Sequence, residues 1–244
     1  EAFEAVLCQP DAIYRAAFQL FDTNGSGFIT FDEFEEIIKL TTLHNKIPFN
    51  FKSDFVRLHF GEGHKRTVNF AEFSQVLHDF HEEHAVQAFK SRDTSKQGVI
   101  SAIDFSDIMI NCKSHLLSED VRRNLVAVAG AGTGGHQVTF PYFIAFNTLL
   151  NNMELVKRIY LSFTKGSVQL EMTKEEFLYA SQQMSHITPL EIDILFQLAG
   201  TIHQSTGRIS YDDLERIAAQ RPTKYLSKPI AEVKATQPTG ERGV

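Results

Sequence analysis

The stretch DTNGSGFITFDE at residues 22–33 supplies oxygen-bearing groups at positions 1, 3, 5, 7, 9 and 12 of a tight loop. Calcium takes six to eight oxygen ligands, and a twelve-residue loop presents them at these positions. Gly27, at position 6, permits the sharp turn that such a loop needs. Amphipathic runs flank the loop, which argues against an ordinary polar turn. The spacing therefore predicts a calcium site of the EF-hand type, with ligands from Asp22, Asn24, Ser26, the backbone carbonyl of Phe28, Thr30 through a water, and bidentate Glu33.

Five weaker copies of this pattern follow along the chain. Successive position-8 hydrophobic residues are separated by 39, 32, 38, 34 and 37 residues, at Ile29, Val68, Ile100, Val138, Met172 and Ile209. EF-hands pair through a short two-stranded bridge at these positions, and the long–short alternation shows which neighbours pair. We therefore predict an all-α fold, an array of three EF-hand pairs with six mostly degenerate hands, at residues 11–80, 81–150 and 151–220.

The other five loops have weaker metal chemistry. Loop 93–104 keeps Asp93 and the turn glycine but offers neutral groups at positions 3 and 5, and Asp104 is too short for a bidentate grip. Loops 61–72, 131–142, 165–176 and 202–213 begin with Gly61, Ala131, Lys165 and Ile202, so each lacks the first acidic ligand. We interpret these four as EF-hands that keep the helix–loop–helix structure, do not bind metal and have a structural role.

Composition excludes several classes of function. The formal net charge of −6 argues against nucleic acid as a partner. No run of 18 apolar residues exists, so nothing in this stretch of sequence is expected to span a bilayer. Cys8 and Cys112 lie far apart in helix-like contexts and are interpreted as free thiols.

Catalytic signatures are equally weak. The glycines of 130–135 fit G-x-G-x-x-G, but a helical pattern precedes them where a dinucleotide site needs a strand. His78, His81 and His84 lie three residues apart without the H-E-x-x-H pattern of zinc enzymes, and a solvated helix explains them better. No nucleophile elbow is present. We therefore predict that the chain is not an enzyme.

Several longer stretches resemble one known family. They are AFQLFD at 17–22, HNKIPFNF at 44–51, AIDFSDIM at 102–109, LLNNMEL at 149–155 and TPLEIDILFQLA at 188–199. Together they are similar to the regulatory N-terminal domain of the mitochondrial aspartate/glutamate carriers. The resemblance runs continuously over about residues 1–218, which makes it far more specific than a lone EF-hand loop.

The resemblance implies an eight-hand domain that faces the intermembrane space and precedes a six-helix carrier domain in the inner membrane. That carrier exchanges aspartate for glutamate and a proton. On this template the chain holds hands three to eight, and residues 1–8 form the exit helix of a preceding hand. The family also implies homodimers through the later hands. Residues 221–244 would form a linker or amphipathic tail, in which Tyr225–Ala235 docks into the groove of the last pair near Leu195, Leu198 and Leu214.

One departure from the family pattern concerns the metal site. In the well-known members calcium is held by hand two, whereas here the intact loop, 22–33, belongs to hand three. Its assignment therefore depends on its own chemistry. Two other functions stay open: a free-standing EF-hand sensor or buffer that binds target helices, and an autoinhibitory module of a calcium-activated enzyme. A free sensor is expected to carry several intact loops, and this chain has one.

Overall fold

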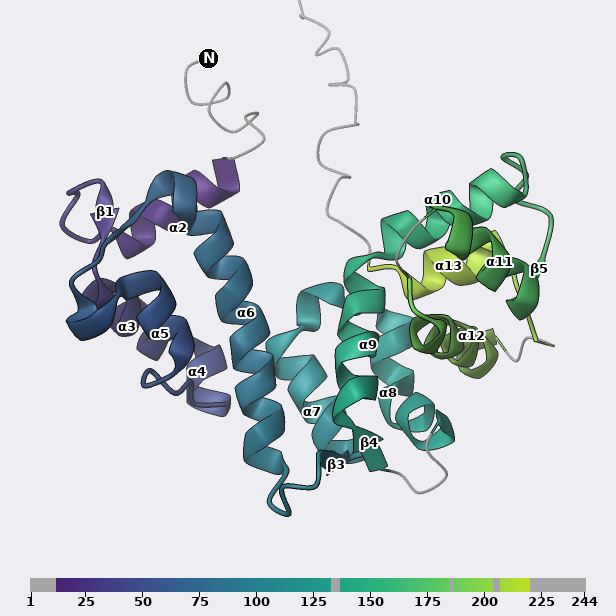
Figure 1. Ribbon diagram of the computed structural model, residues 1–244, viewed down its shortest axis with the longest axis horizontal. Helices are drawn as coiled ribbons and strands as arrows, with labels where there is room; N and C mark the ends of the chain where they lie inside the picture. The colour runs from purple at the N-terminus through teal and green to yellow at the C-terminus, as the bar shows by residue number, and fades with distance from the viewer. Residues whose placement is uncertain (1–11, 133–136, 185–186, 204–206, 220–244) are drawn as a thin grey trace, which may run out of the picture.

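The computed structural model describes residues 12–132, 137–184, 187–203 and 207–219, and these are mostly helical (Figure 1). The elements follow in the order α2 Ala12–Phe21, β1 Phe28–Ile29, α3 Phe31–Leu40, α4 Thr42–Lys46, α5 Asp54–Phe60, η1 Glu62–His64, β2 Val68–Asn69, α6 Phe70–Arg92, β3 Val99–Ser101, α7 Ala102–Cys112, η2 Ser114–Leu116, α8 Glu119–Gly132, β4 Gln137–Thr139, α9 Phe140–Asn151, α10 Met153–Phe163, β5 Met172–Thr173, α11 Lys174–Met184, α12 Pro189–His203, β6 Arg208–Ile209 and α13 Tyr211–Ile217.

Within the described ranges, three short antiparallel sheets join loops that are distant in sequence. The strand β1 pairs with β2, β3 with β4, and β5 with β6. The position-8 residues face each other in every sheet, as Ile29 with Val68, Ile100 with Val138, and Met172 with Ile209. The strand pairing predicted from the alternating spacing is therefore confirmed. All six of these side chains are buried, so each bridge also contributes to a core.

Each helix that follows a loop begins at a side-chain cap. In loop 22–33, Thr30 at position 9 accepts from the N–H of Glu33, and the Glu33 carboxylate accepts from the N–H of Thr30. Asn69 with Glu72 and Ser210 with Asp213 form the same reciprocal pair. These capping boxes satisfy N–H groups that a helix end leaves unpaired. The acid at position 12 thus fixes the start of the exit helix whether or not the loop binds a metal.

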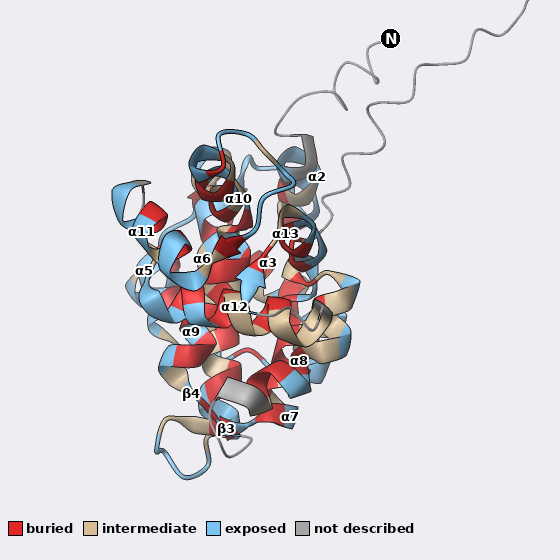
Figure 2. Ribbon diagram, turned by 90° about the vertical axis from the view of Figure 1, so that its right-hand side faces the viewer, coloured by how far each residue is buried: buried red, intermediate tan, exposed pale blue. Residues whose placement is uncertain are grey.

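The buried side chains of the described residues form two hydrophobic cores. The first contains residues between Phe18 and Phe80 and consists largely of phenylalanine. The second includes Ile47 and residues from Ala85 to Ala218, so the second and third predicted pairs share it. Helix α6 runs from the lobe of α2–α5 to strand β3 (Figure 1) and contributes to both cores. Figure 2 shows that the buried segments lie towards the inside of the helices and the exposed ones towards the outside. The boundary that we predicted between residues 80 and 81 falls inside this helix.

The histidines of α6 correct one interpretation. His78 is exposed, but His84 is 1% exposed and its Nε2 lies 2.7 Å from the carbonyl oxygen of Ile47. Burial is the largest cause that lowers the pKa of His81 to about 4, and the charge of Lys113 acts in the same direction, so this ring is neutral at pH 7. The solvated helix that we predicted is therefore wrong for His84, which packs at the junction of the two cores.

Some predictions fall outside the described residues. These are the exit helix at 1–8, the thiol of Cys8, part of the glycine-rich segment at 133–136, and the tail at 221–244. Leu195, Leu198 and Leu214, named as the groove for the tail, belong to the second core. Cys112 is buried with a free thiol, and burial raises its pKa to about 12.

The first core predicts a large cost for removing Phe34. Its ring is fully buried and lies 5.2–5.6 Å, between ring centroids, from Phe21, Phe60 and Phe80. Phe34→Ala should lower the free energy of unfolding by about 3–5 kcal/mol, because the cavity has no side chain to fill it. Urea denaturation followed by circular dichroism measures the change. Leu40→Ala is the control, since Leu40 is 73% exposed and a change within about 0.5 kcal/mol is expected. Equal effects of the two substitutions would contradict the packing.

Candidate metal centre

Loop 22–33 connects α2 to α3 and contains β1. Gly27 has a φ of 80°, and no atom lies within 4 Å of the position that a Cβ would take. The backbone conformation alone therefore requires glycine at this position, which agrees with the turn predicted at position 6. The turn brings the side chains at positions 1, 3 and 5 to one side of the loop.

The first half of the loop is held by acceptor oxygens. Asp22 Oδ1 accepts from the backbone N–H of Ser26 at 2.9 Å, and its Oδ2 accepts from that of Gly27 at 2.8 Å. Asn24 Oδ1 accepts from the same Ser26 N–H at 2.8 Å. The Ser26 hydroxyl donates to the carbonyl oxygen of Phe28 at 2.9 Å. The predicted ligands at positions 1, 3, 5 and 7 thus already converge on one another.

Glu33 closes the loop from its far end. Its Oε1 accepts from Thr23 Oγ1 at 3.0 Å and from the Asn24 N–H at 3.3 Å. Its Oε2 accepts from the N–H of Thr30 at 3.0 Å and from its hydroxyl at 2.9 Å. Burial raises the pKa of the Glu33 carboxyl, but the hydrogen bonds from these donors outweigh it and hold the pKa below its ordinary value. The carboxylate is therefore ionised at neutral pH, as a cation ligand must be.

This set of groups fits calcium. It consists of carboxylate, amide, hydroxyl and carbonyl oxygens, which a hard cation prefers, and the two carboxylates lie at opposite ends of the loop. Asp22 and Glu33 would supply the negative charge, and the remaining oxygens would complete the shell. Within the described part of the chain, no group of three or more His, Cys, Asp or Glu side chains is placed to hold a metal. Loop 22–33 is not a cluster of that kind, because it offers two carboxylates together with neutral oxygen groups.

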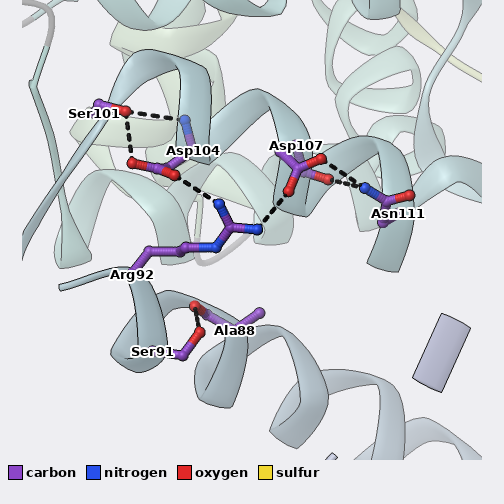
Figure 3. A network of polar contacts seen from close by, with 7 residues as sticks. All are labelled: Ala88, Ser91, Arg92, Ser101, Asp104, Asp107 and Asn111. Atoms are coloured by element: carbon purple, nitrogen blue, oxygen red, sulfur yellow. Dashed lines mark hydrogen bonds and ion pairs between the residues drawn. The ribbon is translucent and has the colours of Figure 1, made fainter. Parts of the chain in front are cut away.

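Loop 93–104 starts in the same way and ends differently. Asp93 accepts from the N–H groups of Gly98 at 2.7 Å and Gln97 at 3.2 Å, much as Asp22 does. Asp104 at position 12, however, pairs with the guanidinium of Arg92 at 2.8 Å (Figure 3). A cationic side chain is thus bound to the carboxylate that would face the metal.

Loop 61–72 also carries an arginine on its last acid. Arg66 Nη2 lies 2.5 Å from Glu72 Oε1. From the sequence we interpreted loop 61–72 as lacking its first acidic ligand, and neither the contact of Arg66 nor that of Arg92 was predicted. The signal was present, because Arg92 directly precedes the first loop residue, Asp93. A position next to the loop in the sequence does not show which acid a long side chain reaches. Only the structure therefore reveals the two ion pairs.

A family model for the EF-hand domain matches residues 13–41, which contain α2, loop 22–33 and α3. The loop geometry and this match define the class: the chain carries an EF-hand, and calcium is its ion.

The curated relatives narrow the class further. The chain is 51% identical over 217 residues to the mitochondrial electrogenic aspartate/glutamate antiporter SLC25A13 of Mus musculus, covering 89% of the chain and 32% of that protein. It is 50% identical over 217 residues to SLC25A12 of the same organism, with the same coverage. The probable calcium-binding mitochondrial carrier K02F3.2 of Caenorhabditis elegans is 44% identical over 252 aligned residues, 100% of the chain and 35% of that protein.

The chain is therefore a homologue of the mitochondrial aspartate/glutamate carriers, and the resemblance predicted from its sequence is confirmed. It spans about a third of the length of these relatives. Across the residues that the structure describes, no helix is both long and apolar enough to cross a membrane.

The geometry of loop 22–33 predicts one dominant calcium site. Isothermal titration calorimetry should show a dissociation constant of roughly 10⁻⁷ to 10⁻⁵ M, the range of sensor EF-hands. Glu33→Gln should weaken the affinity by at least about 100-fold, because the number of charged ligands sets EF-hand affinity over several orders of magnitude. Asp32→Asn is the matched control, since the neighbouring carboxylate is exposed and outside the ligand set. Unchanged binding by Glu33→Gln would refute the assignment.

Proposed function

We propose that this chain is the calcium-sensing regulatory and dimerisation region of a mitochondrial inner-membrane aspartate/glutamate antiporter, and that it faces the intermembrane space. The observation that carries the proposal is loop 22–33, whose ligand oxygens converge in a chain that is about 50% identical to such antiporters. The ligands are Asp22, Asn24, Ser26, the carbonyl of Phe28, Thr30 and Glu33. The transporting domain belongs to the part of the relatives that this chain does not cover.

The array itself comprises three EF-hand pairs. The three antiparallel sheets support this count, because each joins two loops of twelve residues at their eighth positions. The units are residues 11–80, 81–150 and 151–220, with α6 shared between the first two. Calcium binding to the first unit changes the loop that starts α3, and α3 packs in the phenylalanine-rich core with α6. Helix α6 then carries the change towards the second core.

The later hands serve self-association in this proposal. Their loops have lost the first acidic ligand or pair their last one with arginine, yet their helices remain. Several large hydrophobic side chains on these helices are exposed, namely Ile103, Val126, Ile144, Tyr179 and Leu190. An exposed apolar side chain gains free energy when a second copy covers it. Closed two-fold dimers are the commonest assembly of soluble chains.

The free-standing sensor is the less favoured function. A sensor of that kind uses several loaded loops to open grooves for target helices. In the described residues only loop 22–33 combines acids at positions 1 and 12 with neutral donors on both.

Transport measured in liposomes tests the regulatory role. The full-length protein that contains this chain should exchange aspartate for glutamate at a rate that differs between calcium and a chelator. Asp32→Asn should keep this response and Glu33→Gln should lose it, while both retain a basal exchange rate because the substitution lies outside the transporting domain. A calcium response that survives in Glu33→Gln would overturn the proposed role of the loop.

Sedimentation tests the assembly. The chain has a mass of 27.6 kDa, and at tens of micromolar it should sediment as a species of twice that mass. Tyr179→Lys and Ile103→Lys each place a charge on an exposed side chain of the later helices. If either residue lies in the interface, its substitution should weaken the dimer at least about tenfold, since burying an unpaired charge is costly. A wild-type monomer at this concentration would refute dimerisation by this region.

A further inference from the structure

In an EF-hand that binds calcium, the ion links the entry helix to the exit helix at the mouth of the loop. Calcium supplies that link when it binds oxygens after the entry helix together with the acid at position 12, in the first turn of the exit helix. Loops 61–72 and 93–104 keep this acid, as Glu72 and Asp104, without a complete set of metal ligands. In both loops, one arginine side chain makes the link instead.

Arg92 joins α6 to α7. It is the last residue of α6, the entry helix of loop 93–104. Its Nη1 lies 2.8 Å from Asp104 Oδ1, and its Nη2 lies 2.7 Å from Asp107 Oδ2 (Figure 3). Both acids belong to α7, the exit helix, with Asp104 in its first turn and Asp107 one turn further on. Further bonds hold the acids in place, from the Ser101 hydroxyl to Asp104 at 2.7 Å and from the Asn111 amide to Asp107 at 2.9 Å.

Arg66 joins α5 to α6 by a different route. It lies within loop 61–72 itself, at position 6. Its Nη1 donates to the carbonyl oxygen of Leu58 in α5 at 3.1 Å, and its Nη2 pairs with Glu72 Oε1 in the first turn of α6. The Asn69 N–H and then the Arg66 guanidinium lower the pKa of the Glu72 carboxyl. The entry helix and the exit helix of this hand are thus connected through one cationic group.

Among the described residues, no cationic side chain contacts Glu33, the last acid of the intact loop. Glu33 also accepts four hydrogen bonds, but its donors are two hydroxyls and two backbone N–H groups, all neutral. A cation can replace hydroxyl donors at a carboxylate without displacing another charge. At Asp104 and Glu72 it would first have to displace a guanidinium, which stays charged at every physiological pH.

We propose that Arg66 and Arg92 are internal cations that take the place of calcium in loops 61–72 and 93–104, joining entry helix to exit helix and excluding the metal. Arginine suits this role because its planar fork binds two acceptors at once, which an ammonium group does less well. The two hands then keep one conformation at all calcium concentrations. The inference rests on the proposed identity of both loops as EF-hands, and it confines the calcium response to loop 22–33.

A gain of calcium binding tests the exclusion of metal. Loop 22–33 is first silenced with Glu33→Gln, and this variant alone shows whether that loop is the native site. Asp104→Glu, added to it, restores a long acid at position 12 while Arg92 remains. Asp104→Glu with Arg92→Gln removes the competing charge as well. Calorimetry with calcium should give at least about tenfold tighter binding in the variant that lacks Arg92, since removing one charge from a loop changes its affinity strongly.

Equal calcium affinities in these two variants, including no binding in either, would overturn the exclusion of metal by Arg92. Failure of the proposed calcium site is a separate result, because Glu33→Gln alone would then bind calcium as the wild type does. A purely structural role of Arg92 would lower stability without any gain of calcium binding, so the comparison also separates these roles.

Stability without metal tests the link between the helices. In a chelator, Arg92→Met and Arg66→Met should each lower the Tm by about 2–4 °C and speed amide hydrogen exchange in the first turn of the exit helix. Arg123→Met is the matched control, because Arg123 pairs with Glu119 at 3.0 Å within the single helix α8. Variants of Arg66 and Arg92 that behave like the control in both measurements would overturn the proposal.

Discussion

The hydrogen-bonded pair between positions 9 and 12 of each loop is the interaction on which the array depends. Thr30 with Glu33, Asn69 with Glu72, and Ser210 with Asp213 show it in its reciprocal form. The pair fixes the residue at which the exit helix begins, and so aims that helix relative to the two-stranded sheet just before it. Because the acid of the pair caps a helix, it has a structural use that is independent of metal. This explains why loops that begin with Gly61 or Ile202 still end with an acid.

The carboxylate at position 12 can accept hydrogen bonds from different kinds of donor, and neighbouring hands of this chain use different donors. The donors to Glu33 in the described part of the chain are all neutral, whereas Glu72 and Asp104 each pair with a guanidinium. On the proposed function, one hand of the first unit responds to calcium and its partner stays fixed. The sheet that pairs Ile29 with Val68 joins the two hands. On this proposal, loop 22–33 moves relative to loop 61–72, which keeps its conformation. Helix α6 continues from that neighbour into the second core.

Two features of this arrangement escaped prediction for different reasons. Residues 70–92 contain neither proline nor glycine, so the pattern carries no sign that one helix ends and another begins near residue 80, and indeed none does. We placed a boundary there because pairs of hands were expected to be separate units. His84 was misjudged because its neighbours His78, Glu82 and Glu83 are polar. Its burial depends on Ile47 and Phe49, which approach from a segment more than thirty residues away.

The sequence by itself determined the twelve-residue loop 22–33, the similarity to the aspartate/glutamate carriers, and the partners of the three sheets in the described residues; the six ligand positions stay a prediction. These are local or periodic properties: a metal loop is contained in twelve residues, and the spacing of hydrophobic residues shows which loops pair. Tertiary structure alone decided that two units share a core, that α6 is continuous, and that Arg66 and Arg92 reach the acids of their loops. A long flexible side chain has many possible partners within its reach, and only the packing of the helices selects one.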